Sequence, residues 1–260
     1  MGDAAGLAST SGETGRYTAR MSFLLALDSS TETLVVALSR ETDLLAREGE
    51  GGARASEQMV PQAMALLAQA GLRLAELDAI AFAAGPGAFT GLRPACAVAQ
   101  GLAFGAGKPV LPLDSLLLVA EDLRLQQPQA RLTGPCWVLM DARMNEIYAA
   151  AYEWQGDHWV TLRSPALYTL PAAAEALQSL PPQAMAGNAL SVFADALAPV
   201  LPAAVPQAAT TRSRAAALAS LARQAWRAGA AVDAAEAMPV YVRDKVAQTT
   251  AERLAAKGAA

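Results

Sequence analysis

The sequence predicts an α/β fold made of two duplicated α/β domains. One pattern occurs twice along the chain: a short apolar strand, an aspartate, a five-residue turn and a second apolar strand. The aspartates are Asp28 and Asp141, and the strands after the turns begin at Leu34 and Ile147, so both pairs are 113 positions apart. A second observation is the stretch 79–105, where an apolar strand, a glycine-rich turn and a helix of small residues follow one another.

Composition places the chain among globular proteins. It has 260 residues, of which 53% are hydrophobic and 17% are charged, enough for one large or two modest domains. We expect a first domain over 21–130 and a second over 131–260. Residues 1–20 lack the apolar core of a signal peptide, so we interpret them as a disordered extension or as a segment before a natural start at Met21.

Charge, hydropathy and residue types argue against several classes. Twenty basic and 24 acidic side chains give a net charge of −4, so any role with nucleic acid is expected to depend on a partner. No run approaches the roughly 18 apolar residues of a membrane span, and we expect a cytoplasmic protein without membrane association. His158 is the only histidine, and Cys96 and Cys136 have no metal-ligand spacing, so we expect no metal site. Without a serine elbow, Ser-His-Asp hydrolysis is disfavoured.

The first half reads as an antiparallel meander followed by alternating helices and strands. Strands are expected over 22–27, 34–40, 43–47, 79–84 and 109–113. Helices are expected over 56–70, 90–105 and 115–126. Ser56, Thr90 and Asp114 have side chains suited to capping these three helices.

The second half restarts the pattern after Pro- and Gly-containing turns near residues 127–135. Strands are expected over 136–140, 147–152, 158–162 and 183–186. Helices are expected over 170–180, near 191–197 and over 212–228, with a Pro/Ala-rich connection over 198–210. The segment 238–243 reads as extended, and the last residues as a frayed helix.

The turn Gly85-Pro86-Gly87 has two interpretations. Free amides and the dipole of the following helix favour an anion or phosphate site. Open glycine angles equally suit a tight strand-to-helix turn with close packing. No Gly-Lys-Ser or Gly-Lys-Thr follows, so the turn is not a P-loop. Within the helix, Gly91 and Gly101 each cost about 1 kcal/mol relative to alanine, so both require a packing or functional reason.

The two aspartates are candidate ligands of a phosphate-transfer site. Facing hairpins can offer amides to phosphates while each aspartate holds a magnesium ion or a water. Asp28-Ser29-Ser30-Thr31 suits this role, although a plain turn aspartate is an equal interpretation. Asp141 suits it less, because no glycine follows, and a turn aspartate paired with Arg143 is favoured. A residual nucleotide or phosphate site would comprise Asp28, Ser29, Ser30, Thr31, Gly85, Gly87 and Asp141.

Five stretches together carry a resemblance to a known family. They are Leu27–Glu32, Gly85–Arg93, Ala99–Ala103, Asp141–Tyr148 and Tyr241–Arg243. In this order the chain resembles the bacterial TsaB family, also called YeaZ, over about residues 21–245. The resemblance implies the actin-like/Hsp70-like ATPase (ribonuclease H-like) fold, with two duplicated α/β domains.

The resemblance also implies a function and partners. Members of the family are non-catalytic scaffold subunits that support TsaD, a metal-binding paralogue, in transferring threonylcarbamoyl to the adenosine next to the anticodon of tRNA. The expected partners are TsaD as a heterodimer and the ATPase TsaE, with a homodimer as the alternative and tRNA contacted only through the complex. No cofactor is required, and any ATP or ADP binding would be residual. A small-molecule kinase or ATPase of the same fold remains the alternative function.

The resemblance places the partner interface on helices 56–70 and 90–105. The residues expected there are Met59, Ala63, Leu66, Leu67, Gly91, Ala95, Val98, Gly101 and Leu102. A surface of small side chains would suit close helix packing and would explain Gly91 and Gly101. Ala55, Pro94 and Ala95 depart from the family pattern, and the last two could bend the interface helix.

Overall fold

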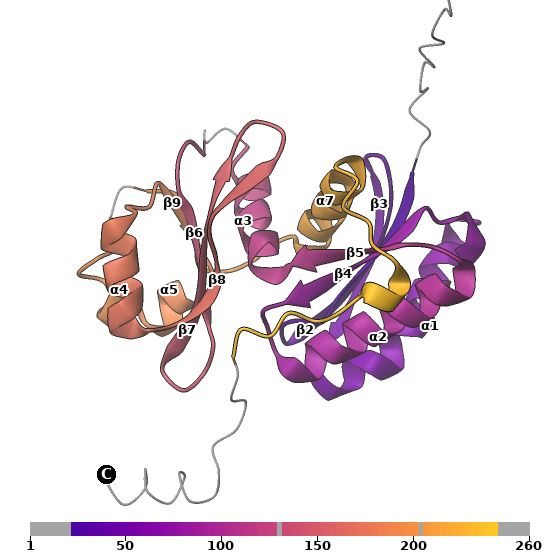
Figure 1. Ribbon diagram of the computed structural model, residues 1–260, viewed down its shortest axis with the longest axis horizontal. Helices are drawn as coiled ribbons and strands as arrows, with labels where there is room; N and C mark the ends of the chain where they lie inside the picture. Colours follow the sequence, from indigo (N-terminus) through magenta and orange to yellow (C-terminus); the bar gives the residue numbers. More distant parts are fainter. Residues whose placement is uncertain (1–21, 129–131, 203–204, 244–260) are drawn as a thin grey trace, which may run out of the picture.

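The computed structural model describes residues 22–128, 132–202 and 205–243, which form two β-sheets side by side with helices around them (Figure 1). The predictions for residues 1–20 and for a frayed helix at the end of the chain lie outside these described residues. No helix in the described ranges is both long and apolar enough to cross a membrane.

The first sheet has five strands in the order β3-β2-β1-β4-β5. The strand β1 pairs antiparallel with β2 and parallel with β4, as expected for a meander followed by a crossover. The bounds are β1 Phe23–Asp28, β2 Thr33–Arg40, β3 Asp43–Glu50, β4 Ala79–Gly85 and β5 Val110–Asp114.

The second sheet repeats this arrangement. Its order is β10-β9-β6-β7-β8, which read backwards matches the first sheet strand for strand. The bounds are β6 Cys136–Asp141, β7 Glu146–Trp154, β8 Trp159–Thr169, β9 Ala184–Ala186 and β10 Gln207–Ala208. The predicted duplicated α/β fold of the actin-like type is therefore confirmed. Among the described strands, β10, the second half of β8 and the last three residues of β3 were not expected from the sequence.

The two hairpins differ in register. Asp28 pairs with Val35, whereas Asp141 pairs with Ile147, so the second turn is one residue tighter than the first. Arg143, Met144 and Asn145 all adopt left-handed backbone angles, with φ of 65°, 57° and 57°. Such angles cost about 1–2 kcal/mol for each residue that carries a side chain. The β6–β7 turn is therefore a costly conformation that other contacts must hold.

Two layers of helices cover the first sheet. On one face lie α1, Ala55–Gln69, and α2, Phe89–Ala106, whose apolar sides join a buried cluster with β1, β2 and β4. On the other face lies α7, Arg214–Arg227, which places Leu218 and Leu221 against the sheet (Figure 1). Short 3-10 turns occur at Gly52–Arg54, Leu74–Glu76 and Ala234–Glu236 (η3).

The second sheet is covered by α3 on one face and by shorter helices on the other. The helix α3, Ser115–Gln126, packs Leu116, Val119 and Leu123 against β6, β7 and β9. The opposite face carries α4, Leu170–Ser179, and the single turns α5, Ala189–Val192, and α6, Ala194–Leu197. The helix α3 also places Leu118 against the first sheet, and α7 and Val232 return to that sheet late in the chain.

The predicted helix caps were right in one case and wrong in two. Asp114 caps α3 by accepting hydrogen bonds from the amides of Leu116 and Leu117. Thr90 and Ser56 instead lie inside α2 and α1. The start of α2 is set by a contact distant in sequence, since the Ala88 amide donates to the Ser30 carbonyl, 2.9 Å away.

Candidate functional site

A cleft of about 440 Å³ lies between the two sheets. The first sheet and its helices line it with the β1–β2 turn, the loop before α2 and the start of α7. The second sheet lines it with the β6–β7 turn and α5, and the start of α3 lies between the two sheets. Of the residues predicted for a phosphate site, the structure brings Ser30, Thr31, Gly87 and Asp141 together in this cleft. Asp28, Ser29 and Gly85 lie outside its lining.

Asp28 is engaged by an arginine that the sequence analysis did not single out. It is fully buried and forms an ion pair with Nε of Arg214, at the start of α7. The other Asp28 oxygen accepts from the Ser30 amide at 2.8 Å, and Nη2 of Arg214 donates to Ser30 Oγ at 2.8 Å. Both carboxylate oxygens are therefore used inside the protein, and a guanidinium supplies the positive charge that a metal ion would bring.

The glycines near the cleft are explained by close backbone contacts. A Cβ on Gly87 would lie 2.6 Å from the Ser30 carbonyl oxygen, and one on Gly91 would lie 1.6 Å from that of Ser29. At Gly85, where φ is 128°, a Cβ would lie 2.4 Å from the Val240 carbonyl oxygen. These distances explain why the three positions are glycine, because the chain's own backbone lies where a side chain would begin.

Asp141 is likewise bonded within its own turn. Its Oδ1 accepts from the Arg143 amide at 2.8 Å, and its Oδ2 lies 3.7 Å from the Arg143 guanidinium, which confirms the predicted pairing. The Asp141 amide donates to Asn188 Oδ1 at 2.8 Å. Arg143 also reaches Glu32 across the cleft at 3.3 Å, but both side chains are largely exposed, so this pair contributes little to stability.

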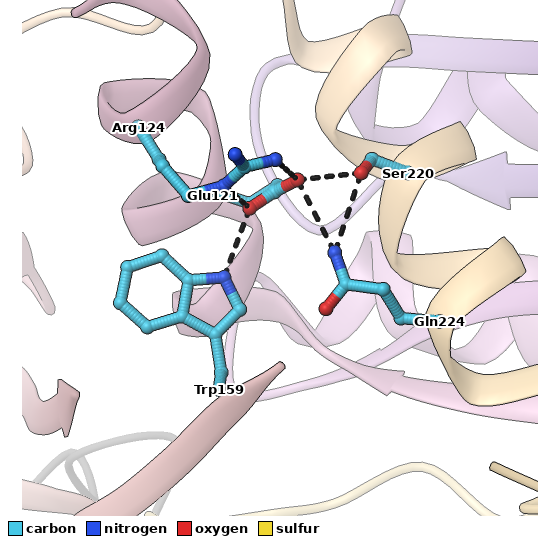
Figure 2. Close-up of polar contacts among 5 residues, drawn as sticks. All are labelled: Glu121, Arg124, Trp159, Ser220 and Gln224. Carbon is cyan, nitrogen blue, oxygen red and sulfur yellow. Dashed lines mark hydrogen bonds and ion pairs between the residues drawn. The ribbon is translucent and has the colours of Figure 1, made fainter. Parts of the chain in front are cut away.

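A buried carboxylate links α3 with β8 and α7 (Figure 2). Glu121 of α3 has no exposed surface and accepts two hydrogen bonds of 2.7 Å from Arg124. It also accepts from Trp159 Nε1 on β8 at 2.9 Å, and from Ser220 and Gln224 on α7 at 2.5 and 3.3 Å. The hydrogen bonds between Arg124 and Glu121 raise the pKa of Arg124 above its usual range. The Glu121 cluster, defined by these five residues, fixes α3 against α7.

Two other carboxylates also hold α3 to the elements around it: Asp122 bonds to the start of α7, and Asp114 bonds to β7. Asp122 accepts from the amides of Arg212 and Ser213 at 3.1 and 2.8 Å and thereby holds the start of α7, which carries Arg214. Asp114 accepts from the hydroxyl of Tyr152 at 2.5 Å. Burial raises the pKa of Asp114, and burial together with the Asp114 charge raises that of Tyr152. The bonds from Asp122 of α3 to the start of α7 thus help to position Arg214, the arginine that neutralises Asp28.

Most of the predicted interface residues are core residues instead. Met59, Ala63, Leu66, Leu67, Gly91 and Ala95 are buried within this chain, so a partner cannot contact them. Their helical periodicity marks the side that α1 and α2 turn to their own sheet. Val98 and Leu102 are partly buried, and Gly101 is exposed with nothing within 4 Å of a Cβ placed on it. Pro94 leaves α2 continuous from Phe89 to Ala106.

The outer side of these two helices carries large apolar side chains that the sequence analysis did not select. Phe104 of α2 is 80% exposed, and Met64 and Val60 of α1 are 45% and 39% exposed. We call these three residues, with Gly101, the outer face. Exposed apolar side chains of this size are candidates for a protein–protein contact.

The histidine and the two cysteines of the chain do not line the cleft. His158 is more than half exposed and lies 2.6 Å from Asp157. Cys96 and Cys136 are free and buried, and burial raises the pKa of Cys136 to about 12, which makes its thiol unreactive. Among the described residues, no three His, Cys, Asp or Glu side chains are grouped as a metal site.

The repeated strand order and the cleft between the sheets define a duplicated α/β protein of the actin-like class. The family model of TsaD, tRNA N6-adenosine threonylcarbamoyltransferase, matches residues 50–251. YeaZ from Pseudomonas aeruginosa has a similar structure, with a TM-score of 0.71 and 34% identity over 85% of this chain and 100% of that chain. The chain belongs to the TsaB (YeaZ) family, which is related to TsaD.

Curated relatives agree with this membership. The tRNA threonylcarbamoyladenosine biosynthesis protein TsaB of Haemophilus influenzae is 40% identical over 126 residues, 48% of this chain and 51% of that protein. The protein of the same name from Escherichia coli is 30% identical over 148 residues, 55% of this chain and 62% of that protein. The matched region thus spans half to three fifths of these relatives.

Proposed function

We propose that this chain is a non-catalytic, cytoplasmic scaffold subunit that supports TsaD in transferring threonylcarbamoyl to the adenosine next to the anticodon of tRNA. The observation that carries the proposal is the buried ion pair between Asp28 and Arg214. A phosphate-transfer enzyme of this class needs a free carboxylate for its magnesium ion, and here an arginine of the same chain occupies that carboxylate. The proposed partners are TsaD and TsaE, with tRNA contacted through the complex and no cofactor required.

The alternative, a small-molecule kinase or ATPase, draws support from the 440 Å³ cleft. We expect Mg-ATP to leave the melting temperature of this protein unchanged. Ligand at 100 times its Kd stabilises a fold by about 2.7 kcal/mol, which would raise the melting temperature by several degrees. Thermal unfolding with and without Mg-ATP measures this, with Mg²⁺ alone as the control. A rise of several degrees together with ATP turnover would favour the kinase.

We further propose that TsaD binds the outer face of α1 and α2. Phe104→Asp is expected to weaken a one-to-one complex with TsaD by roughly 30-fold or more, because a buried aromatic anchor in an interface is worth about 2 kcal/mol or more. Light scattering after size exclusion, with titration calorimetry, measures the complex.

The control is Leu162→Asp, another exposed apolar position, 39% exposed, on β8 of the other domain. Both variants should keep the melting temperature of the unaltered protein, because both side chains already face solvent. Equal affinity of the two variants for TsaD would contradict the placement. A homodimer that persists in the presence of TsaD and TsaE would contradict the scaffold function itself.

A further inference from the structure

A segment near the end of the described chain crosses from the first domain to the second. Residues 237–243, which we call the strap, run in extended form after η3, past α2 and on toward the second sheet (Figure 1). The strap is neither helix nor strand, so its position depends on individual contacts. These contacts fall into three groups along its length.

The first group fastens the strap to α2 and to β4. The Ala237 carbonyl accepts from Gln100 Nε2 at 3.0 Å and from Cys96 Sγ at 3.5 Å, both on α2. Three residues later, the Val240 amide donates to the Ala84 carbonyl at 2.7 Å. The missing side chain of Gly85 leaves room for this approach. The start of the strap therefore belongs to the first domain.

The second group joins the strap to the first turns of α2. The Tyr241 hydroxyl accepts from Arg93 Nε at 3.0 Å. The same guanidinium lies 3.7 Å from the centre of the Phe89 ring, and the rings of Phe89 and Tyr241 are 5.2 Å apart. Tyr241 is nevertheless 44% exposed and Met238 is 68% exposed, so this part of the strap shares the solvent side of α2. A partner seated along α2 can therefore contact the strap as well.

The third group anchors the strap to the second domain through Arg243. Its Nη2 lies 2.7 Å from Glu146 and donates to the Ala142 carbonyl at 2.9 Å, and its Nη1 lies 3.2 Å from Met144 Sδ. Only 10% of the Arg243 side chain is exposed. Ala142 and Glu146 flank the three left-handed residues, so Arg243 supports the costly β6–β7 turn that borders the cleft.

We propose that the strap couples partner binding on α2 to the β6–β7 turn, with Arg243 as the positioning residue. The inference rests on the proposed function, since the partner is TsaD. With Arg243 anchored, Tyr241 and Met238 are held beside α2 before the partner arrives. Once the anchor is released, the partner must order these residues itself, and that loss of conformational freedom weakens binding. By linkage, a bound partner stabilises the turn by the same factor.

The test compares Arg243→Ala with Arg163→Ala. Arg163 lies on β8 of the same domain, is partly buried, and donates a hydrogen bond to Ser179 Oγ at 2.8 Å. Like Arg243, it is an arginine bonded within the second domain, but it does not contact the strap. Titration calorimetry measures the Kd for TsaD, and hydrogen exchange follows the Val240 amide. We expect Arg243→Ala to weaken TsaD binding by about 5-fold or more, the lower end of typical coupling between sites, and to speed Val240 exchange. Arg163→Ala should change neither quantity.

A further arm separates coupling from a general loss of stability. Tyr241→Phe removes only the hydroxyl that meets Arg93, and its effect on Kd should shrink when Arg243 is already alanine. A fall in melting temperature alone would not produce this non-additivity. If unaltered protein binds TsaD and Arg243→Ala binds it equally well, the coupling is overturned while the scaffold function stands. If unaltered protein does not bind TsaD, the proposed function and the coupling both fail.

Discussion

Gly91→Ala is expected to lower the free energy of unfolding by about 3 kcal/mol or more. The new methyl group would lie 1.6 Å from the carbonyl oxygen of Ser29 and 2.7 Å from its carbonyl carbon. These are backbone atoms of a buried turn, and the Ser29 hydroxyl also donates to the Gly91 carbonyl at 2.8 Å. Neither element can yield without breaking contacts of the Asp28 turn, so the gain in helix propensity from alanine is outweighed.

The matched control is Gly101→Ala, ten residues further along the same helix. A Cβ there meets nothing within 4 Å, so only the helix propensity changes, and we expect stabilisation by up to about 1 kcal/mol. Urea unfolding followed by circular dichroism gives both values. Similar effects at the two positions would contradict the close contact between α2 and the Asp28 turn.

That Gly91 needs a packing reason follows from its place in a helix, but the contact that supplies the reason cannot be found from the sequence. Its neighbour Ser29 is 62 positions away, and no local pattern reports such a contact. The same limit applies to Arg214, which is 186 positions from Asp28. The strand-aspartate-turn-strand pattern could be detected, because it repeats at a fixed offset and each copy is local in sequence.

The interface residues show a different limit. The family resemblance places the interface on α1 and α2, and Met59 and Ala95 are among their apolar and small residues at helical spacing, a spacing that does mark a buried side. Periodicity does not say whether that side is buried against the protein's own sheet or against a partner. Phe104 was not selected, and only the fold shows that its side chain is exposed.

The Glu121 cluster had no sequence signal, although it holds the domains together. Its members come from α3, β8 and α7, and the sequence separations from Glu121 to Trp159 and Gln224 are 38 and 103 positions. A glutamate on an amphipathic helix ordinarily reads as a solvated residue. Here it is buried because α3 packs on the second sheet with one side and meets α7 of the first sheet with another (Figure 2).

Glu121→Ala is expected to destabilise the protein by about 3–5 kcal/mol, the cost of removing one member of a buried charged pair. The change removes the acceptor of Trp159 Nε1, Ser220 and Gln224 and leaves Arg124 without its carboxylate. Glu175→Gln, on the exposed side of α4, serves as the control and should alter the free energy of unfolding by less than about 0.5 kcal/mol.

The two readouts of this variant distinguish a joint between domains from ordinary core packing. Urea unfolding of Glu121→Ala should give the lowered free energy. Hydrogen exchange should quicken at the facing parts of α3 and α7, whereas β1 and β4 should stay protected, because these strands also pack on α1 and α2 in a cluster that contains no residue of α3 or α7. Loss of protection spread evenly over both sheets would contradict the joint. Exchange confined to α3 and α7 would mean that the contacts of α3 hold α7 in place, and with it Arg214 and its ion pair with Asp28.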